Sequence, residues 1–576
     1  MTYSLHAMPA PMRWTLIPKP DATQVSELAS ALNVTELVAR LLVQRGITTF
    51  DGAKAFFRPT LESLHDPYLM KDMDKAVARI EQAMAGGENI LVFGDYDVDG
   101  TTAVALLSTY LRSIYENVDT YIPDRYDEGY GVSYKGIDYA DDNGVTLIIA
   151  LDCGVKSVAH VAYAKEKGID FIICDHHRPG PELPDAVAVL DPKRDDCTYP
   201  YDELCGCGVG FKLVQALGAN REQGLLDLYP YLDLVATAIA ADIVPITGEN
   251  RVLAYYGLKV MNTHPRPGLK ALLFQTRKSV IDISDVVFIV APRINAAGRI
   301  RHGQHAVTLL CETDFTQALA YAKEIEQYNA DRKDLDKAIT QQALWQIEEN
   351  GEQDRYTTVV FQEDWHKGVI GIVASRLIET YYRPTLVFTK SGDKYAASAR
   401  SVAGFDVYNA LETCAEHLEQ FGGHMYAAGM TLRPENYQDF KNAFEETVKN
   451  TLPEALRVPE ITVDAEVAFT DLDAKTRRIL KMFEPFGPGN RMPVFLSRNV
   501  HDTGYAKRIG QNGEHLKMFV RQVDSDGIGA IAFGLGDHLE QVANRRPFSL
   551  IFCLEENEWN GEVTPQLRVK DIRQNF

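Results

Sequence analysis

The hexapeptide at residues 95–100 (DYDVDG) constrains the fold of this 576-residue chain more than any other segment. It follows the apolar run 90–93, which predicts a buried strand, and precedes residues 101–107, which predict a helix with a threonine cap. The carboxylates of Asp95, Asp97 and Asp99 therefore gather where a parallel strand ends, and open α/β sheets bind ligands there. Their mutual repulsion predicts a cation beside them. An Asp-rich turn without an ion, or a calcium loop, remains an alternative for the hexapeptide alone.

Three more predicted strands, at residues 146–151, 170–174 and 186–190, also end in aspartate. Helical stretches separate these strands, and the alternation predicts a doubly wound parallel sheet that brings its strand ends to one edge. A single strand-end aspartate is ordinary turn chemistry, but four of them with two adjacent histidines predict a site. The side chains that follow these strands are Asp152, the Asp175-His176-His177 triplet and Asp191.

A further acid, Asp242, follows the apolar segment 234–241, which predicts a buried helix. A charge after so apolar a run is rarely buried without a partner. Asp242 is therefore either another ligand of the predicted site or an ordinary helix-end residue, and the pattern alone leaves both open.

Composition and charge narrow the class of protein. The formal net charge of −21 argues against a broad basic nucleic-acid-binding face, although arginine clusters and bound cations can reverse the field within one cleft. No apolar run is long enough to span a membrane and no signal-peptide pattern is present, so we expect no membrane association. The eight cysteines form no CxxC pair, and Cys205-Gly206-Cys207 is expected to be a tight turn. Reduced thiols in the cytoplasm are the simplest interpretation.

The remaining pattern divides the chain into five parts. Residues 1–87 predict an N-terminal helical cap, 88–311 the α/β domain with the carboxylates, and 312–354 a long connector helix. Residues 355–457 predict a second α/β domain, and the short strands of 458–576 predict a small β-barrel of the OB type.

Three regions carry residue types that suit phosphate or single-stranded nucleic acid. The segment 291–299 places Arg293, Asn295 and Arg299 among small residues, which predicts either a phosphate contact or a solvated basic turn. In the second α/β domain, predicted loops suited to anions contain Ser398, Arg400, Ser401, Gly422, Gly423 and His424. The barrel offers charged and aromatic side chains for stacking with bases, or simply its ordinary surface: Lys507, Arg508, Lys517, Phe519, Arg521 and Phe533.

These motifs together resemble the DHH phosphoesterase superfamily, and the Gly422-Gly423-His424 segment resembles its DHHA1 domain. The order of parts, over essentially the whole chain, is similar to the RecJ family of bacterial single-strand-specific 5′→3′ DNA exonucleases. The resemblance implies two divalent ions, Mn²⁺ or Mg²⁺, that clamp the scissile phosphate and activate a water for in-line attack. It implies as ligands Asp97, Asp99, Asp152, His176 and Asp242, with Asp95 beside them and His177 on the phosphate or leaving group.

The resemblance further implies that Arg125, Arg299, Ser398 and Arg400 hold the 5′ phosphate and nearby backbone. The expected activity is hydrolysis of single-stranded DNA to mononucleotides in DNA repair and recombination. The expected context is a cytoplasmic monomer whose partner proteins are a single-strand-binding protein and a helicase. Two alternatives stay open: a phosphodiesterase acting on cyclic dinucleotides or short oligonucleotides, and a non-catalytic single-strand-binding replication scaffold.

Overall fold

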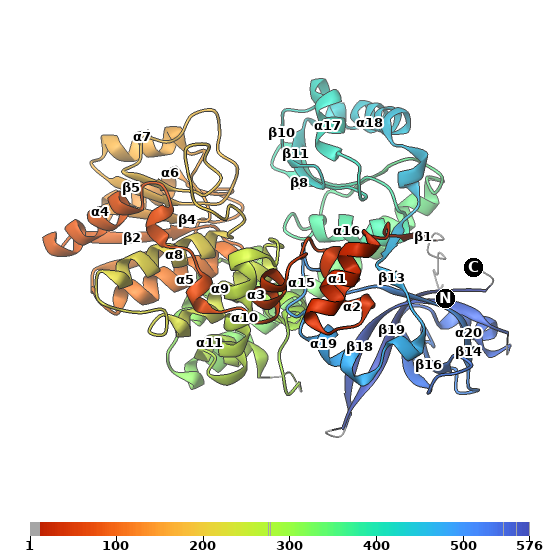
Figure 1. Ribbon diagram of the computed structural model, residues 1–576. Helices are drawn as coiled ribbons and strands as arrows, with labels where there is room; N and C mark the ends of the chain where they lie inside the picture. Colours follow the sequence, from red (N-terminus) through yellow and green to blue (C-terminus); the bar gives the residue numbers. More distant parts are fainter. Residues whose placement is uncertain (1–11, 275, 277, 545, 560–561, 575–576) are drawn as a thin grey trace. The chain divides into compact units, whose positions relative to one another are not determined.

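A computed structural model describes residues 12–274, 276, 278–544, 546–559 and 562–574 (Figure 1). The chain forms two compact units, one made of residues 20–329 and 474–492 and the other of the described residues before 20 together with 330–473 and the part from 493 onward. The predicted long helix is α15 (Phe315–Glu349), and it runs from the first of these units into the second. None of the described helices is both long and apolar enough to cross a membrane.

The first unit is built on a five-stranded parallel sheet, which confirms the predicted doubly wound architecture. Its strand order is β3 (Val118–Tyr121), β2 (Asn89–Gly94), β4 (Val145–Leu151), β5 (Asp170–Cys174) and β6 (Ala188–Leu190). Gly94, Leu151, Cys174 and Leu190 lie in one row across four strands. Because the strands end level, the aspartates that follow them start from the same edge of the sheet.

Strand β2 shows how its sequence produces two cores. Its even-numbered residues Ile90 and Val92 belong to one buried cluster, while Leu91 and Phe93 belong to another on the opposite face. Buried side chains of α5 (Val98–Arg112), α8 (Gly206–Ala219), α9 (Leu232–Ala241) and α10 (Gly248–Thr263) belong to the first cluster. Side chains of α6 (Tyr134–Asp142) and α7 (Val158–Glu166) belong to the second. A sheet covered on both faces explains why its strands are continuous apolar runs.

The cap of α5 differs from the prediction. Asp97, not a threonine, is the N-cap residue, and its carboxylate accepts the Gly100 N–H at 3.0 Å. The helix therefore begins inside the hexapeptide, because a carboxylate satisfies the otherwise unpaired N–H groups of the first turn. One acid of the predicted metal set thus has a structural partner as well.

The other helices of this unit surround the sheet domain. Near the N-terminus lie α1 (Ala22–Leu32), α2 (Glu36–Val43), α3 (Phe50–Phe57) and α4 (Met73–Gly86). The helices before the connector are α11 (Pro267–Leu273), α12 (Ile283–Asp285), a π-helical turn (Val286–Val290), α13 (Ala291–Ile300) and α14 (Gln304–Cys311). Residues 474–492, which the sequence placed in the barrel domain, group with this unit and include α19 (Ala474–Lys481). The buried Arg251 guanidinium holds this segment by donating to the carbonyls of Met482, Phe483 and Glu484.

The second unit contains a mixed five-stranded sheet in the order β10 (Gln420–His424), β11 (Ala427–Leu432), β9 (Lys394–Arg400), β8 (Thr385–Ser391) and β7 (Thr358–Phe361). Its helices are α16 (Ile370–Thr380), α17 (Val407–Thr413) and α18 (Tyr437–Thr451). The loop predictions for Ser398, Arg400, Gly422, Gly423 and His424 are wrong, because these residues lie within β9 and β10. Pairing of β9 with strands on both sides supplies the hydrogen bonds that make this small-residue segment extended.

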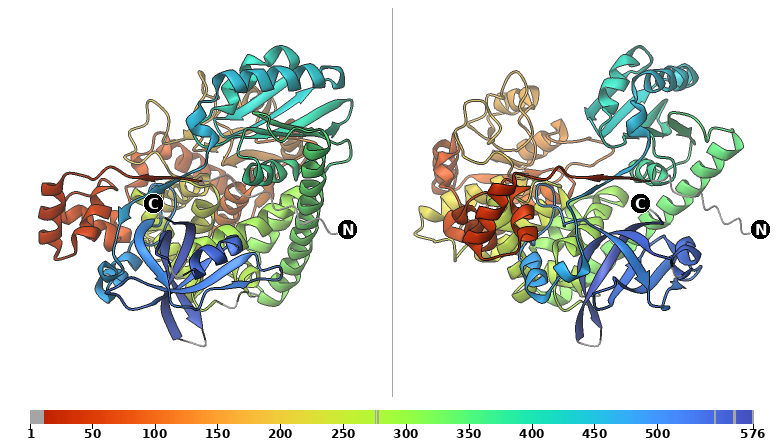
Figure 2. Two further views of the ribbon diagram at one scale, coloured as in Figure 1. Left: turned by 90° about the vertical axis from the view of Figure 1, so that its right-hand side faces the viewer. Right: turned by 45° about the vertical axis from the view of Figure 1, so that its right-hand side comes forward.

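The same unit ends in the predicted β-barrel. Strands β14 (Phe495–Asp502), β18 (Phe548–Trp559), β19 (Glu562–Gln574), β17 (Ile528–Ala532) and β16 (His515–Arg521) pair in that order. Pairing of β14 with β16 closes these five strands into a ring, and Figure 2 shows them curling round. The short strands β13 (Ala465–Glu466) and β15 (Lys507–Ile509) extend it, and α20 (Leu539–Ala543) lies between β17 and β18 in sequence. Strand β12 (Glu460–Val463) pairs separately with β1 (Arg13–Leu16), a strand within the predicted helical cap.

Candidate metal centre

Three carboxylates and one imidazole converge beyond the strand ends of the parallel sheet. His176 Nε2 lies 3.1 Å from Asp152 Oδ1, 3.6 Å from Asp242 Oδ2 and 3.8 Å from Asp99 Oδ2. Within the described residues, Asp152 Oδ1 and His176 Nε2 are buried without a hydrogen-bond partner. Leaving such buried polar atoms unpaired costs free energy, and a cation bound between them would satisfy both.

The ligand atoms fall into two overlapping groups that share His176. One group is Asp99, His176 and Asp242; the other is Asp152, His176 and His177, and in each the atoms lie within 4.8 Å of one another. Carboxylate oxygens mixed with imidazole nitrogens suit Mn²⁺, and the oxygens also suit Mg²⁺. The donor set therefore fits the divalent ions expected from the resemblance.

The N-terminus of α8 positions two of these acids. Asp99 accepts the Gly206 N–H at 2.6 Å and the Cys207 N–H at 2.7 Å. A Cβ on Gly206 would lie 2.5 Å from the Cβ of Asp152, so this position requires glycine. Cys205-Gly206-Cys207, predicted as a tight turn, is instead the start of a helix whose backbone holds the site. The only feature of the sequence that indicated this close packing was a glycine between two small residues.

Asp152 itself adopts an uncommon backbone conformation. Its φ is 60°, in the left-handed region that residues other than glycine rarely occupy. Ile243, directly after Asp242, has φ 61°. Strained residues of this kind cluster at functional sites, where the surrounding structure holds them in place.

His177 is oriented by Asp175, for which the sequence predicted no separate role. Its Nδ1 lies 2.7 Å from Asp175 Oδ1, and Asp175 also accepts the backbone N–H groups of Val155, His176 and His177. Nδ1 therefore carries a proton, and the Tyr130 hydroxyl lies 3.0 Å from Nε2. Burial lowers the pKa of His177, but the hydrogen bond to Asp175 raises it overall, which favours a protonated ring whose Nε2 can donate. The strand-end pattern pointed to Asp175, but no feature of the sequence pointed to Tyr130.

Burial and mutual repulsion control ionisation here. Burial and then the charge of Asp97 raise the pKa of Asp95 to about 8 and of Asp99 to about 7. Burial and then Asp99 raise the pKa of Asp242 to about 8. Burial and then His177 lower the pKa of His176 to about 3, so its ring is neutral and able to ligate. Without a cation this cluster retains protons, which a divalent ion would displace.

Two predicted ligands, Asp95 and Asp97, lie outside both groups. Asp95 is buried, accepts the Gly131 N–H at 3.3 Å and has its Oδ2 without a partner among the described residues. Asp97 uses Oδ1 to cap α5. The charge of Asp97 acts on Asp95 and Asp99, and direct metal ligation by Asp95 or Asp97 stays a prediction.

The predicted phosphate-binding arginines separate into two sets. Arg125 stacks over the Tyr96 ring at 4.3 Å. Gly298, directly before Arg299, packs against the Tyr96 carbonyl, where an added Cβ would lie 2.7 Å from the oxygen, so both arginines come from segments beside the hexapeptide. The 291–299 segment is helix α13, not a turn. Arg293 pairs with Glu326 and donates to the Ile289 carbonyl at 2.7 Å, and Asn295 lies on the same helix, so phosphate binding by either stays a prediction.

A second candidate surface lies on the mixed sheet of the other unit. The register places Arg400, Ala427 and His424 in one row, and Ser398, Gly429 and Gly422 in another. Rows two residues apart share a face, so the Ser-Arg and Gly-Gly-His motifs meet on one side of the sheet. Arg400 Nη1 donates to Ser398 Oγ at 3.1 Å, whereas Ser401 turns away and donates to the Phe405 carbonyl.

Comparison with known proteins agrees with this geometry. Residues 89–239 match the family model "DHH family, N-terminal domain", 353–450 match "DHHA1 domain" and 463–571 match "RecJ OB domain". The parallel sheet with its strand-end acids and these matches define a DHH-family protein.

Relatives that match over most of their length identify the family to which this DHH-family protein belongs. The chain is 38% identical to the single-stranded-DNA-specific exonuclease RecJ of Bacillus subtilis, over 97% of this chain and 70% of that protein. It is 33% identical to the Escherichia coli protein of the same name, over 93% and 95%. The crystal structure of Thermus thermophilus RecJ in complex with Mn²⁺ superposes with a TM-score of 0.84 at 28% identity, covering 98% of this chain and 80% of that one. The chain belongs to the RecJ family.

Proposed function

We propose that this protein is a metal-dependent exonuclease that hydrolyses single-stranded DNA from the 5′ end to mononucleotides. The observation that carries this proposal is the convergence of Asp99, Asp152, His176 and Asp242 at the end of the parallel sheet. The relatives named single-stranded-DNA-specific exonucleases support the substrate, and the closed barrel at the C-terminus suits single-strand binding.

Divalent ions at this cluster would lower the pKa of a water and stabilise the charge that develops on the leaving oxygen. The protein itself contributes fixed ligands: α8 backbone N–H groups orient Asp99, and the strained turn orients Asp152. His177, held by Asp175, presents Nε2 to a phosphate oxygen or the leaving group. Burial raises the pKa of the Cys205 and Cys207 thiols, which remain protonated and are poor nucleophiles, and a metal-activated water is the proposed nucleophile.

The 5′ polarity requires a pocket for the terminal phosphate, and Ser398 with Arg400 on the mixed sheet supplies suitable donors. Arg125 and Arg299 then hold the strand beside the metal ligands. We further place this enzyme in the cytoplasm, as a monomer in DNA repair and recombination whose partners are a single-strand-binding protein and a helicase.

The test is Mn²⁺-dependent digestion of long single strands labelled at either end. We expect release of labelled mononucleotides from 5′-labelled strands at once and from 3′-labelled strands only late. Asp152→Ala should abolish the release of label from both strands. It should leave the thermal unfolding temperature in EDTA nearly unchanged, because Asp152 Oδ1 makes no hydrogen bond that the substitution would remove. Digestion restricted to cyclic dinucleotides or very short oligonucleotides, or binding without turnover, would contradict the proposal.

A further inference from the structure

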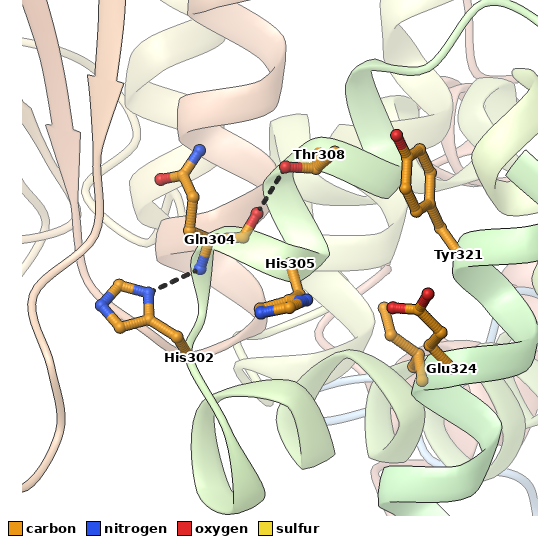
Figure 3. A pocket seen from close by; sticks show the side chains of 7 residues that line it. His302, Gln304, His305, Thr308, Tyr321 and Glu324 are labelled. Carbon is orange, nitrogen blue, oxygen red and sulfur yellow. Dashed lines mark hydrogen bonds between the residues drawn. The ribbon is translucent and has the colours of Figure 1, made fainter. Parts of the chain in front are cut away.

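An open pocket of about 350 Å³ lies between α14 and the first turns of α15, in the same unit as the carboxylate cluster. Figure 3 shows Tyr321 and Glu324 of α15 facing His305 and Thr308 of α14 across it. A volume of this order is at the lower end of small-ligand sites. No residue of this pocket has a role in the activity proposed above.

The pocket is tied to the metal-binding loop by close packing. A Cβ on Gly303, just before α14, would lie 3.3 Å from the Cα of Tyr96, which stands between Asp95 and Asp97 in the hexapeptide. Gln304 donates to Thr120 Oγ1 of β3 at 3.0 Å. The pocket wall and the hexapeptide therefore form one packed structure.

The lining combines flat rings with hydrogen-bond acceptors. Tyr321 and His305 offer ring faces on which a base can stack. The Thr308 hydroxyl donates to the Gln304 carbonyl at 3.0 Å, so its lone pairs remain as acceptors beside the Glu324 carboxylate. Arg301, whose guanidinium lies 5.9 Å from the Tyr328 ring that His305 also contacts, supplies a cation for the phosphate of such a nucleotide.

We propose that this pocket binds one unstacked base of the substrate strand and prefers guanine. This inference rests on the proposed function and names a base subsite within it. Guanine presents an N–H and an adjacent amino group on one edge, and the Glu324 carboxylate can accept both. Thymine presents a single N–H between two carbonyl oxygens, which a carboxylate repels.

The experiment measures binding of the full-length protein in EDTA, where hydrolysis does not interfere. Fluorescence anisotropy compares an all-thymidine strand with strands that carry a single guanosine at successive positions. We expect one position to bind about fivefold more tightly, the lower end of the discrimination that a bidentate base contact provides. Inosine at that position, which lacks the amino group, should lose most of the gain.

Substitutions assign the preference to the pocket. Glu324→Gln should remove the guanosine preference, and Tyr321→Ala should weaken binding of every strand. Asp334→Asn, an exposed acid on the same helix outside the pocket, serves as the matched control and should retain the preference. Equal affinity at every position, or a preference that survives Glu324→Gln, would overturn the inference.

Digestion of the all-thymidine strand with Mn²⁺ separates this inference from the proposed function. A protein that degrades this strand but shows no guanosine preference loses only the base subsite. A protein that shows the preference but degrades no strand retains the base pocket and loses the exonuclease assignment.

Discussion

At the scale of single residues, we propose that Arg400 contacts the terminal 5′ phosphate of a strand. It shares a sheet face with Ser398, Gly422 and His424, where the glycine leaves room for a ligand. Loss of one charge-assisted contact to a terminal phosphate costs about 1.5–3 kcal/mol, or roughly ten- to a hundredfold in affinity. We therefore expect Arg400→Ala to reduce activity on 5′-phosphorylated strands and to narrow their advantage over 5′-hydroxyl strands at subsaturating concentration.

The control for this prediction is Arg433→Ala, because Arg433 lies just beyond β11 of the same sheet and pairs with Glu419 at the surface. It should leave the ratio of the two substrates unchanged. If Arg400→Ala lowers the activity on both substrates by the same factor, then Arg400 contacts the strand backbone generally or stabilises the fold. End recognition would then move to Arg125 or Arg299.

Acids of the cluster that follow strands could be predicted, because the alternation of strands and helices indicates a parallel sheet. The carboxyl ends of its strands then lie along one edge. Asp152 and His176 follow apolar runs, so their meeting at one edge needed only the sheet topology. Tyr130 could not be found in this way, since its contact with His177 joins residues of a loop and a strand end far apart in the chain. Gly206 could not be found either, because it acts by donating its backbone N–H to Asp99, and the type of a residue does not indicate such a role.

At the scale of elements, the start of α8 is part of the site, and Gly206→Ala tests this directly. The added methyl would lie 2.6 Å from Asp152 Oδ1 and 2.8 Å from its Cα, so the whole of Asp152, and with it the carboxylate, must move relative to α8. We expect turnover to fall by about a hundredfold, since small displacements of reacting groups cost that much, with weaker Mn²⁺ binding by calorimetry.

Gly210→Ala, one turn further along α8, provides the matched control. Its added Cβ meets only the end of the Leu151 side chain, at 3.3 Å. Ala is the better helix former, so this variant should fold at least as well and keep its activity. Equal losses in the two variants would show that helix packing, and not the position of Asp152, limits turnover.

The barrel strand β16 presents a second element-level test. Lys517, Phe519 and Arg521 alternate with buried residues and therefore share the outward face predicted for single strands. We expect Lys517→Ala and Arg521→Ala each to reduce the slope of log affinity against log salt by about 0.7, the value for one phosphate contact on a single strand. Titrations over a range of salt concentrations measure this slope. Lys165→Ala on α7 should leave it unchanged, and unchanged slopes in the barrel variants would give this face another role.

Element types were predictable where apolar runs were long and were missed where pairing is distant. Strand β10 contains the Gly422-Gly423 pair, so its sequence is typical of a loop, and it becomes a strand because β11 supplies its hydrogen bonds. Strand β1 was read as helical because its partner, β12, is about four hundred and fifty residues away, as in the pair Arg13 and Glu460. Local sequence cannot show such partners.

At the scale of the whole molecule, we expect the stability of the fold to depend on both metal and pH, because several acids are buried together in a chain whose net charge is −21. In the metal-free protein the pKa values of Asp95, Asp99 and Asp242, at about 8, 7 and 8, lie above the ordinary value of 3.8. The folded state therefore holds more protons than the unfolded state between about pH 4 and pH 8, and its stability falls as pH rises through that window. Ligation requires the deprotonated carboxylates, so Mn²⁺ must displace these protons at low pH.

The increase in unfolding temperature that Mn²⁺ gives over EDTA should therefore be larger at about pH 8 than at about pH 6, because proton competition weakens towards high pH. Differential scanning calorimetry of the full chain at the two pH values measures this difference. Asp152→Ala removes one ligand and should reduce the Mn²⁺ effect at both pH values, which separates binding at the cluster from weak binding elsewhere on an acidic surface. An Mn²⁺ effect of equal size at both pH values would mean that the carboxylates are already ionised in the metal-free protein. Their mutual repulsion would then have to be relieved by water or by separation of the side chains, in place of bound protons.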